Sequence, residues 1–193
     1  PPFLEACQAV ERQMANQLIF NYYFVNDGSK DRTAQLVKQA ETQYSWLTLL
    51  DLTQNAGKAH ALNEGLKLAK HDLVLTVDAD SYLHHFALQC IVERYVADPP
   101  NTRAVAGKIL VRNSRHNLLT KTQEWDYFLG IDATKRLQSL YQGTLVAQGA
   151  FSIYDRNALV EVGGWPECVG EDIVLTWALL RAGYRIGHSE DAC

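Results

Sequence analysis

The chain has 193 residues, of which 47% are hydrophobic, a length and composition typical of one globular domain with a sizeable core. Its formal net charge of −4 argues against a nucleic-acid partner, because such a partner requires a basic face. The four cysteines (Cys7, Cys90, Cys168 and Cys193) are scattered without a C-x-x-C pair, which predicts free thiols in a reducing compartment rather than a zinc site or a disulfide framework.

Short apolar runs predict strands over residues 18–25, 47–52, 73–77, 104–111, 146–154 and 184–186. Amphipathic stretches between them predict helices over residues 4–16, 32–43, 59–70, 84–97, 118–140 and 172–182. This alternation predicts an α/β layered fold with a central, mostly parallel sheet flanked by helices, in which the first three strands are neighbours. The apolar stripe of residues 118–140 is expected to face the core, with a membrane surface or a protein partner as the alternatives.

A polar, turn-forming segment follows each of the first three predicted strands. These segments read "NDGSKD" (residues 26–31), "NAGK" (residues 55–58) and "DADS" (residues 78–81). In layered α/β folds, ligands bind in the crevice beyond the carboxyl ends of the strands. We therefore expect one shared site in which Asp27 and Asp78 open on the same crevice.

Asp78 and Asp80 come directly after an apolar strand and are separated by one residue. Side chains two apart on an extended chain point the same way, so the two carboxylates could converge on one divalent cation. Mg²⁺ and Mn²⁺ take few protein carboxylates and complete their coordination with phosphate oxygens and water. The alternative is an ordinary turn with aspartate caps, but a cation explains better why two carboxylates stand together.

Other polar residues in these segments have an ordinary structural reading beside the functional one. Ser29 or Asp31 could cap the following helix, and Lys58 could be a solvated side chain rather than a phosphate ligand. In "GGWPECVGEDIVLTWALLRAGYRI" (residues 163–186), Trp165 could be a core residue or a platform for a sugar ring. Acidic residues such as Asp172 are favoured at the start of a helix whatever the function.

Taken in order, five segments resemble the family 2 glycosyltransferases, which have the GT-A fold. They are "VNDGSKD", "NAGKAHALNEGL", "VDADS", "QGAF" (residues 148–151) and "GGW…GED…LLRAGYRI". Within that family the sequence most resembles the membrane-bound β-polysaccharide synthases, the group that makes chitin oligosaccharides, hyaluronan and poly-N-acetylglucosamine. The segment "IDATKRLQSL" (residues 131–140) contributes to this closer likeness.

The resemblance implies an inverting, metal-dependent transfer of a sugar from a UDP-sugar donor to a glycan acceptor. Asp172 is then the general base on the acceptor hydroxyl, and Asp78 and Asp80 hold Mg²⁺ or Mn²⁺ against the donor diphosphate. Asp27 faces the uracil or ribose. Gln148 and Gly149 stand where the family usually has Ser-Gly. The expected donor-binding residues are Asp27, Gly28, Lys58, Asp78, Gln148 and Gly149.

The resemblance also predicts that residues 1–193 form one catalytic domain that is incomplete at both ends. The family's first strand, its Gln-x-x-Arg-Trp motif and its membrane helices would lie outside the chain. The intact protein would then sit at the cytoplasmic face of the inner (plasma) membrane, while this piece, in which no segment is apolar enough to span lipid, would be soluble. Two alternatives are a non-catalytic sugar-nucleotide-binding module and a haloacid-dehalogenase-type phosphatase with Asp78 as the nucleophile.

Overall fold

The computed structural model describes residues 20–193 except residues 115, 140 and 142, so the helix expected over residues 4–16 lies outside the described part. The strands are β1 (Tyr22–Asp27), β2 (Leu47–Leu52), β3 (Leu73–Val77), β4 (Thr102–Ala106), β5 (Phe151–Asp155) and β6 (Arg185–His188). The helices are α2 (Thr33–Glu41), α3 (Lys58–Leu68), α4 (Ala87–Ala97), α5 (Leu118–Asp126), the π-helix η1 (Tyr127–Ala133), α6 (Thr134–Ser139), α7 (Arg156–Glu161) and α8 (Glu171–Arg181).

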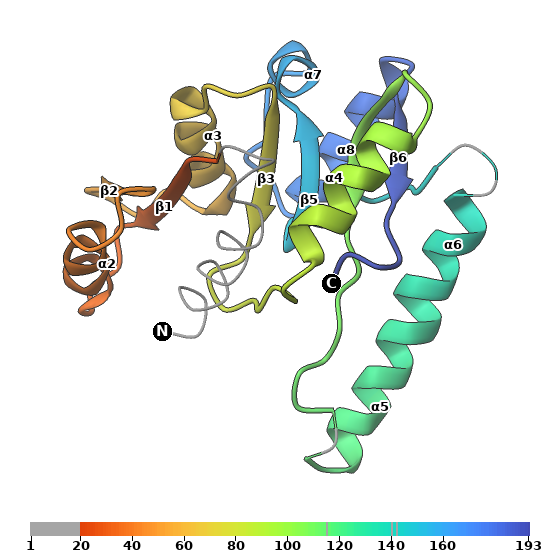
Figure 1. Cartoon of the computed structure of the whole chain (residues 1–193), viewed down its shortest axis with the longest axis horizontal. Helices are drawn as coiled ribbons and strands as arrows, with labels where there is room; N and C mark the ends of the chain where they lie inside the picture. The colour runs from red at the N-terminus through yellow and green to blue at the C-terminus, as the bar shows by residue number, and fades with distance from the viewer. Residues whose placement is uncertain (1–19, 115, 140, 142) are drawn as a thin grey trace.

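The strands form a layered α/β fold with helices on both sides of the sheets (Figure 1). β1 and β2 pair in parallel, and a second sheet has the strand order β3-β5-β4-β6. In this second sheet β5 runs antiparallel to both of its neighbours, while β4 and β6 are parallel. Parallel pairing is therefore less dominant than the sequence predicts, because β5 enters the sheet from the loop after α6 and reverses the strand direction.

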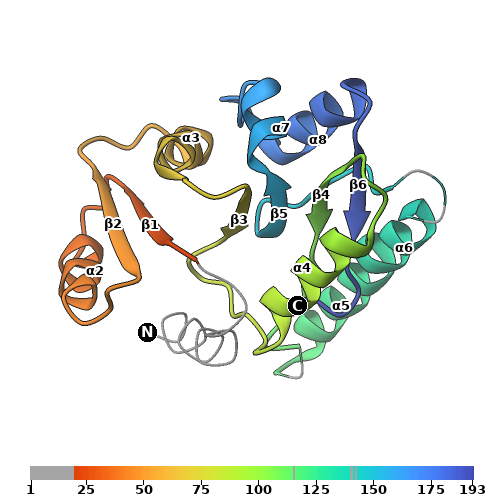
Figure 2. The ribbon, with the colours of Figure 1, turned by 45° about the horizontal axis from the view of Figure 1, so that its top comes forward.

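The expectation that the first three strands are neighbours in one sheet is wrong for the third. Among the described residues β3 pairs only with β5, and Figure 2 shows β1 and β3 splayed apart. A cavity of about 790 Å³ lies between them, lined by apolar residues of β1, α3 and β3. Asp27, Lys58 and Asp78 line the same cavity, so the shared crevice is confirmed although the shared sheet is not.

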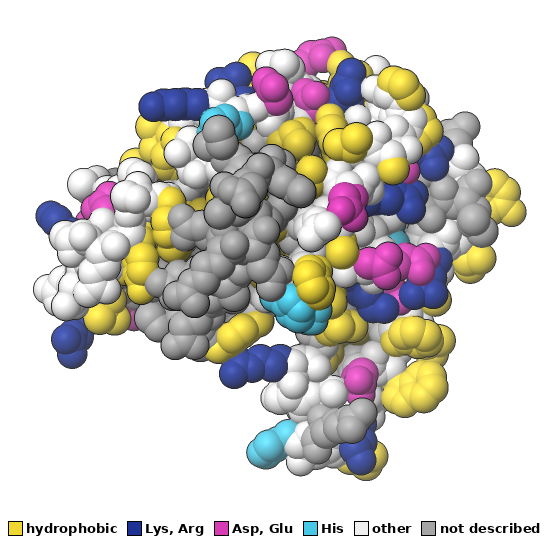
Figure 3. Space-filling model, in the orientation of Figure 1, with side chains coloured by type: hydrophobic (Ala, Val, Ile, Leu, Met, Phe, Trp, Pro, Cys, Tyr) yellow, Lys and Arg dark blue, Asp and Glu magenta, His cyan; other side chains and the backbone are white. Residues whose placement is uncertain are grey.

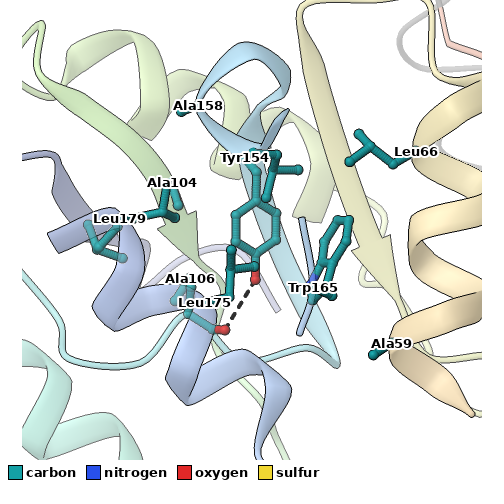
Figure 4. Close-up of a cluster of buried hydrophobic side chains, with 12 residues drawn as sticks. Ala59, Leu66, Ala104, Ala106, Tyr154, Ala158, Trp165, Leu175 and Leu179 are labelled. Carbon is teal, nitrogen blue, oxygen red and sulfur yellow. Dashed lines mark hydrogen bonds between the residues drawn. The ribbon is translucent and has the colours of Figure 1, made fainter. Parts of the chain in front are cut away.

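A core of buried side chains fixes the relative positions of α3, β5 and α8 (Figure 4). Tyr154 on β5 packs edge-on against Trp165, with 5.6 Å between ring centroids, and its hydroxyl donates to the carbonyl of Ala147 at 3.1 Å. Trp165 is buried, which identifies it as a core residue, and it also contributes to the lining of the cavity. Burying two aromatic side chains supplies much of the apolar stabilisation here and holds the segment before β5 against α8.

The helices α5, η1 and α6 form one long rod along the side of the domain, and its apolar stripe does not face the core (Figure 1). Trp125 is 64% exposed, Leu137 is 63% exposed, and α5 has no buried residue. Figure 3 shows hydrophobic side chains exposed along the right-hand side of the molecule, where Figure 1 places α5 and α6. Asp132 and Lys135 are buried, and Asp132 forms ion pairs with Lys108 and His188 that join the rod to the body.

Cys90, Cys168 and Cys193 are free thiols, in agreement with the prediction. Among the described residues, no helix has both the length and the apolar character needed to cross a bilayer.

Candidate active site

The end of β1 is tied to the loop before α3 by the carboxylate of Asp27. Its two oxygens accept the backbone N–H groups of Ala56 and Gly57, both at 2.9 Å. The side-chain N–H of Asn55 donates a hydrogen bond to the backbone carbonyl of Asp27 at 2.9 Å. Asp27 therefore orders the loop that begins α3, and its place beside the cavity is compatible with the predicted nucleotide contact.

Gly28 is required where this loop meets β1. Its φ of +66° lies in the left-handed region, and an added Cβ would come within 2.6 Å of the backbone nitrogen of Asn55. Gly28 thus serves the close approach of two backbones. Asp31 accepts the N–H of Thr33 at 3.0 Å, so the predicted helix cap is confirmed.

Lys58 is the first residue of α3, and its Nζ lies 2.5 Å from Oδ1 of Asp78 at the end of β3. The positive end of the helix dipole disfavours a cation at this position, and the negative charge of Asp78 offsets this unfavourable interaction. Both side chains are partly exposed toward the cavity. The pair joins two elements far apart in sequence and presents an ammonium group where a phosphate could bind.

Asp78 and Asp80 do not lie on an extended chain, which corrects the argument from strand geometry. β3 ends at Val77, and residues 78–81 form a turn closed by the N–H of Ser81 and the carbonyl of Asp78 at 2.9 Å. A turn begins here because the N–H of Asp78 already bonds the carbonyl of Ala150, completing the ladder with β5. Asp80 is exposed and makes no hydrogen bond or ion pair with any residue that the structure describes.

The residues available for a divalent cation at this turn are two carboxylates. Within the described chain no group of three or more His, Cys, Asp or Glu side chains gathers, so a cage made wholly of protein ligands is not formed. A pair of carboxylates fits Mg²⁺ or Mn²⁺, which keep water and phosphate oxygens as ligands, and of this pair Asp78 lines the cavity. Asp80 is open to such a cation, whereas Asp78 shares its carboxylate with Lys58.

Asp172 meets the segment before β5 at the first turn of α8. Its Oδ2 accepts the N–H of Gly149 at 3.3 Å, and its Oδ1 accepts the N–H of Ile173 at 2.8 Å. A Cβ on Gly149 would lie 3.3 Å from Nζ of Lys58 and 3.8 Å from a carboxylate oxygen of Glu171. The small residue therefore lets α3, the segment before β5 and α8 converge.

Gln148 is held by its backbone, whose carbonyl accepts the Ser152 hydroxyl at 2.7 Å. Its Oε1 is buried without a hydrogen-bond partner among the described residues. A buried, unpaired amide oxygen next to Gly149 favours a role in holding a ligand. The structure thus brings Lys58, Asp78 and Gly149 together with Asp172, and Asp27 lines the same cavity.

Sequence patterns missed two residues that shape this region. Asn63 of α3 bonds the backbone of Trp165 in both directions, at 2.7 and 2.9 Å, and positions the turn before α8. Lys135 of α6 is 4% exposed, and burial lowers its pKa to about 8 although Asp172 and Asp132 oppose the change. Lys135 lies in the segment "IDATKRLQSL", which contributed to the family likeness, but no pattern pointed to this lysine in particular.

The sequence profile described as glycosyl transferase family 2 matches residues 1–163. The chain belongs to glycosyl transferase family 2. This family 2 glycosyltransferase is 34% identical to the poly-beta-1,6-N-acetyl-D-glucosamine synthase of Staphylococcus aureus (strain COL), across 96% of the chain and 47% of that protein. The chain therefore spans about half the length of the curated relatives that it matches.

Solved structures carry the same fold. A mannosyltransferase from Pyrobaculum calidifontis, in complex with GDP-Man and Mn²⁺, superposes with a TM-score of 0.73 at 27% identity, covering 98% of this chain and 53% of that one. TarS of S. aureus, in complex with UDP-GlcNAc, gives a TM-score of 0.67 at 21% identity over 98% and 51% of the two chains. The expected GT-A glycosyltransferase fold is confirmed, as is the likeness to the polysaccharide synthases.

Proposed function

We propose that this glycosyltransferase transfers N-acetylglucosamine from UDP-GlcNAc, with inversion, to a hydroxyl group of a growing β-linked glycan. The observation that carries the proposal is that Lys58, which pairs with Asp78, and Asp172 both approach Gly149. The Lys58 ammonium offers a hydrogen-bond donor for a diphosphate, and the Asp172 carboxylate offers an acceptor for a hydroxyl proton. The match to poly-beta-1,6-N-acetyl-D-glucosamine synthases supports the choice of sugar.

On the donor side, Lys58 neutralises charge that develops on the departing diphosphate. Asp78 and Asp80 would hold a Mg²⁺ or Mn²⁺ ion, which when bound supplies Lewis-acid stabilisation of the same leaving group. The mannosyltransferase with a similar fold was solved with Mn²⁺, which supports this assignment. Asp27 keeps the loop before Lys58 in place, and Gln148 and Gly149 line the approach to the sugar.

On the acceptor side, Asp172 accepts the proton of the attacking hydroxyl as the new glycosidic bond forms and the bond to the diphosphate breaks. The N–H of Gly149 orients one of its oxygens, so the carboxylate is fixed before the acceptor arrives. General-base catalysis of this kind contributes roughly 10²–10⁴-fold. A membrane location for the intact protein, through segments outside this chain, belongs to the same proposal.

The test is a transfer assay on the intact protein with radiolabelled UDP-GlcNAc and, in parallel, GDP-mannose. We expect incorporation into a polymer from UDP-GlcNAc alone, in a reaction that requires Mg²⁺ or Mn²⁺. Exclusive use of GDP-mannose would overturn the donor assignment. Metal-dependent UDP binding by a folded protein that neither transfers nor hydrolyses any donor would instead support the non-catalytic binding module.

A further inference from the structure

Thr176 places a hydroxyl group inside the core that α8 helps to form. Its side chain is completely buried, and the helix carries the core residues Leu175 and Leu179 on either side of it in sequence. Valine has nearly the same shape and would bury no polar group that needs a partner. The hydroxyl at this position is therefore to be explained by the hydrogen bonds that it makes.

The hydroxyl of Thr176 makes two hydrogen bonds, which lead to different segments. Its Oγ1 donates to the backbone carbonyl of Asp172, one turn earlier in α8, at 2.6 Å. A threonine inside a helix often bonds the carbonyl four residues back, so this bond alone is ordinary. The same Oγ1 also accepts the N–H of Ala147 at 2.9 Å. Thr176 thus joins the segment before β5 to the turn of α8 that carries Asp172.

Ala147 is fixed through both of its backbone polar groups. Its N–H is held by Thr176, and its carbonyl accepts the hydroxyl of Tyr154 at 3.1 Å (Figure 4). Both hydrogen bonds are buried, so water does not compete for either partner. Two hydroxyl groups, one from α8 and one from β5, therefore set the position of the chain at Ala147.

The contact between this segment and the proposed base lies two residues further along. The N–H of Gly149 donates to Oδ2 of Asp172 at 3.3 Å, which is at the long end of the range for an N–H···O hydrogen bond. Both hydrogen bonds of the Thr176 hydroxyl are shorter. A small shift of the segment away from α8 would break the longer bond first, so the Gly149 contact depends on the spacing that Thr176 sets.

We propose that Thr176 is a positioning residue for sugar transfer, whose hydroxyl holds the segment before β5 against α8 and thereby keeps the N–H of Gly149 on the Asp172 carboxylate. This inference rests on the proposed function, in which Asp172 is the general base. Thr176 is buried and does not touch the donor or the acceptor. Its loss would misplace the carboxylate that takes the hydroxyl proton.

The test combines Thr176→Val, which removes the hydroxyl and keeps the shape, with Asp172→Asn in a double-mutant cycle on the intact protein. With Asp172 present, Thr176→Val should lower kcat about tenfold, because a misplacement of about 1 Å at a reacting group costs up to about 100-fold. In the Asp172→Asn background no base is left to position, so the same change should lower kcat less than about twofold. A residue that only stabilises the fold would lower kcat by the same factor in both backgrounds.

Thr176→Ser keeps the hydroxyl and should keep kcat within about twofold of wild type. UDP affinity in the presence of Mn²⁺ should not change in either variant, because the carbonyl of Gln148 is held independently by the Ser152 hydroxyl at 2.7 Å. Calorimetry measures this affinity, and the number of UDP molecules bound per protein gives the folded fraction by which kcat is corrected. Thr120→Val is the matched control, since it makes the same substitution in the capping box of α5 and should retain the wild-type kcat.

An equal loss of kcat in both backgrounds would overturn the inference, as would a wild-type kcat in a folded Thr176→Val protein. So would a loss in Thr176→Ser as large as that in Thr176→Val, since the hydroxyl would then not be the cause. If Thr176→Val does not fold, Thr176→Cys takes its place in both backgrounds, because a thiol fills a similar volume and is only a weak hydrogen-bonding group.

The two proposals fail in different ways. If wild type transfers sugar and Asp172→Asn loses turnover, the proposed function stands, and the comparison of Thr176→Val between the two backgrounds alone decides the role of Thr176. If Asp172→Asn transfers at the wild-type rate, Asp172 is not the base, and the role of Thr176 is overturned with it.

Discussion

The ammonium of Lys58 and the carboxylate of Asp78 lie 2.5 Å apart, so the first turn of α3 and the end of β3 meet at one charged pair. Under the proposed function, donor binding must rearrange this pair, because the Lys58 ammonium cannot stay fully committed to Asp78 while it contacts a diphosphate. The same proposal requires a cation to replace Lys58 as the partner of Asp78.

Replacing Lys58 with methionine should weaken UDP binding by about 10- to 100-fold, since charge-assisted hydrogen bonds contribute roughly 1.5–3 kcal/mol. Isothermal titration calorimetry on the intact protein measures the change. Lys67→Met is the matched control, because Lys67 lies on the same helix and pairs with Glu64 away from the cavity. Equal losses in the two variants would indicate a general effect of charge rather than a phosphate contact.

Asp80→Asn should abolish the difference between UDP affinity in Mn²⁺ and in EDTA, while wild type binds more tightly with the metal. The reason is that Asp80 has no other partner among the described residues and is open to a cation. Titrations of UDP with and without metal check this, with Asp126→Asn, an exposed aspartate on α5, as the control. Metal-independent binding in wild type would contradict a cation site at this turn.

Asp172→Asn should lower turnover by about 10²-fold or more and leave donor affinity nearly unchanged, the pattern expected for a lost general base. The two oxygens of Asp172 accept the N–H groups of Gly149 and Ile173 separately, and asparagine keeps only one of these acceptors, so we expect a small fall in the melting temperature. Transfer kinetics and a melting curve on the same preparation separate the two effects. A folded variant with normal turnover would assign Asp172 to helix capping.

Gly28→Ala should destabilise the fold more than Gly57→Ala. Both glycines have positive φ, and Gly57, with a ψ of 162°, lies outside the left-handed helical region, so we assign roughly 1–3 kcal/mol to the backbone strain of another residue at either position. An alanine at Gly28 would also press on the backbone of Asn55, adding roughly 1–3 kcal/mol, whereas no atom lies within 4 Å of a Cβ on Gly57. Urea unfolding of the two variants measures the difference. Equal losses would mean that the loop moves away freely.

Because of Lys135, the free energy of unfolding should rise with pH in the alkaline range. Burial lowers its pKa from 10.5 to about 8, so the unfolded state binds more protons between these values and stability rises with pH across that window. The full effect is about 3 kcal/mol. Lys135→Met should lack this rise and be the more stable protein at pH 7. Denaturation curves of wild type and variant are measured side by side at pH 7 and pH 10. The difference between the two proteins in the change of unfolding free energy with pH gives the contribution of Lys135.

The sequence could predict where the polar site residues lie, because each of them follows a strand or opens a helix, and local signals mark those places. Asp27, Lys58 and Asp78 were found this way and line one cavity, whereas Asp172 was singled out by the family resemblance. Strand pairing could not be predicted in this way. Pairing depends on contacts between distant segments, so the residues of β5 alone do not indicate that β5 pairs antiparallel with β3 and β4.

The orientation of the rod could not be predicted for a related reason. Periodicity identifies an apolar face but does not say what that face meets, and Trp125 and Leu137 belong to a face that is exposed. The sequence argument also assumed that Asp78 and Asp80 lie on an extended strand, whereas the chain turns at Asp78. In both cases a local geometry was assumed to continue beyond the residue at which tertiary contacts interrupt it.

The two backbone N–H groups held by Asp27 bear on how mutations in this protein are to be interpreted. An Asp27 variant loses the anchor of the loop before α3, and the loop carries Lys58 with it. If such a variant loses activity, a rate measurement alone does not separate the loss of the proposed nucleotide contact from the displacement of the lysine. A double-mutant cycle with Lys58 distinguishes them, since additive losses mark independent contacts and non-additive losses mark a shared one.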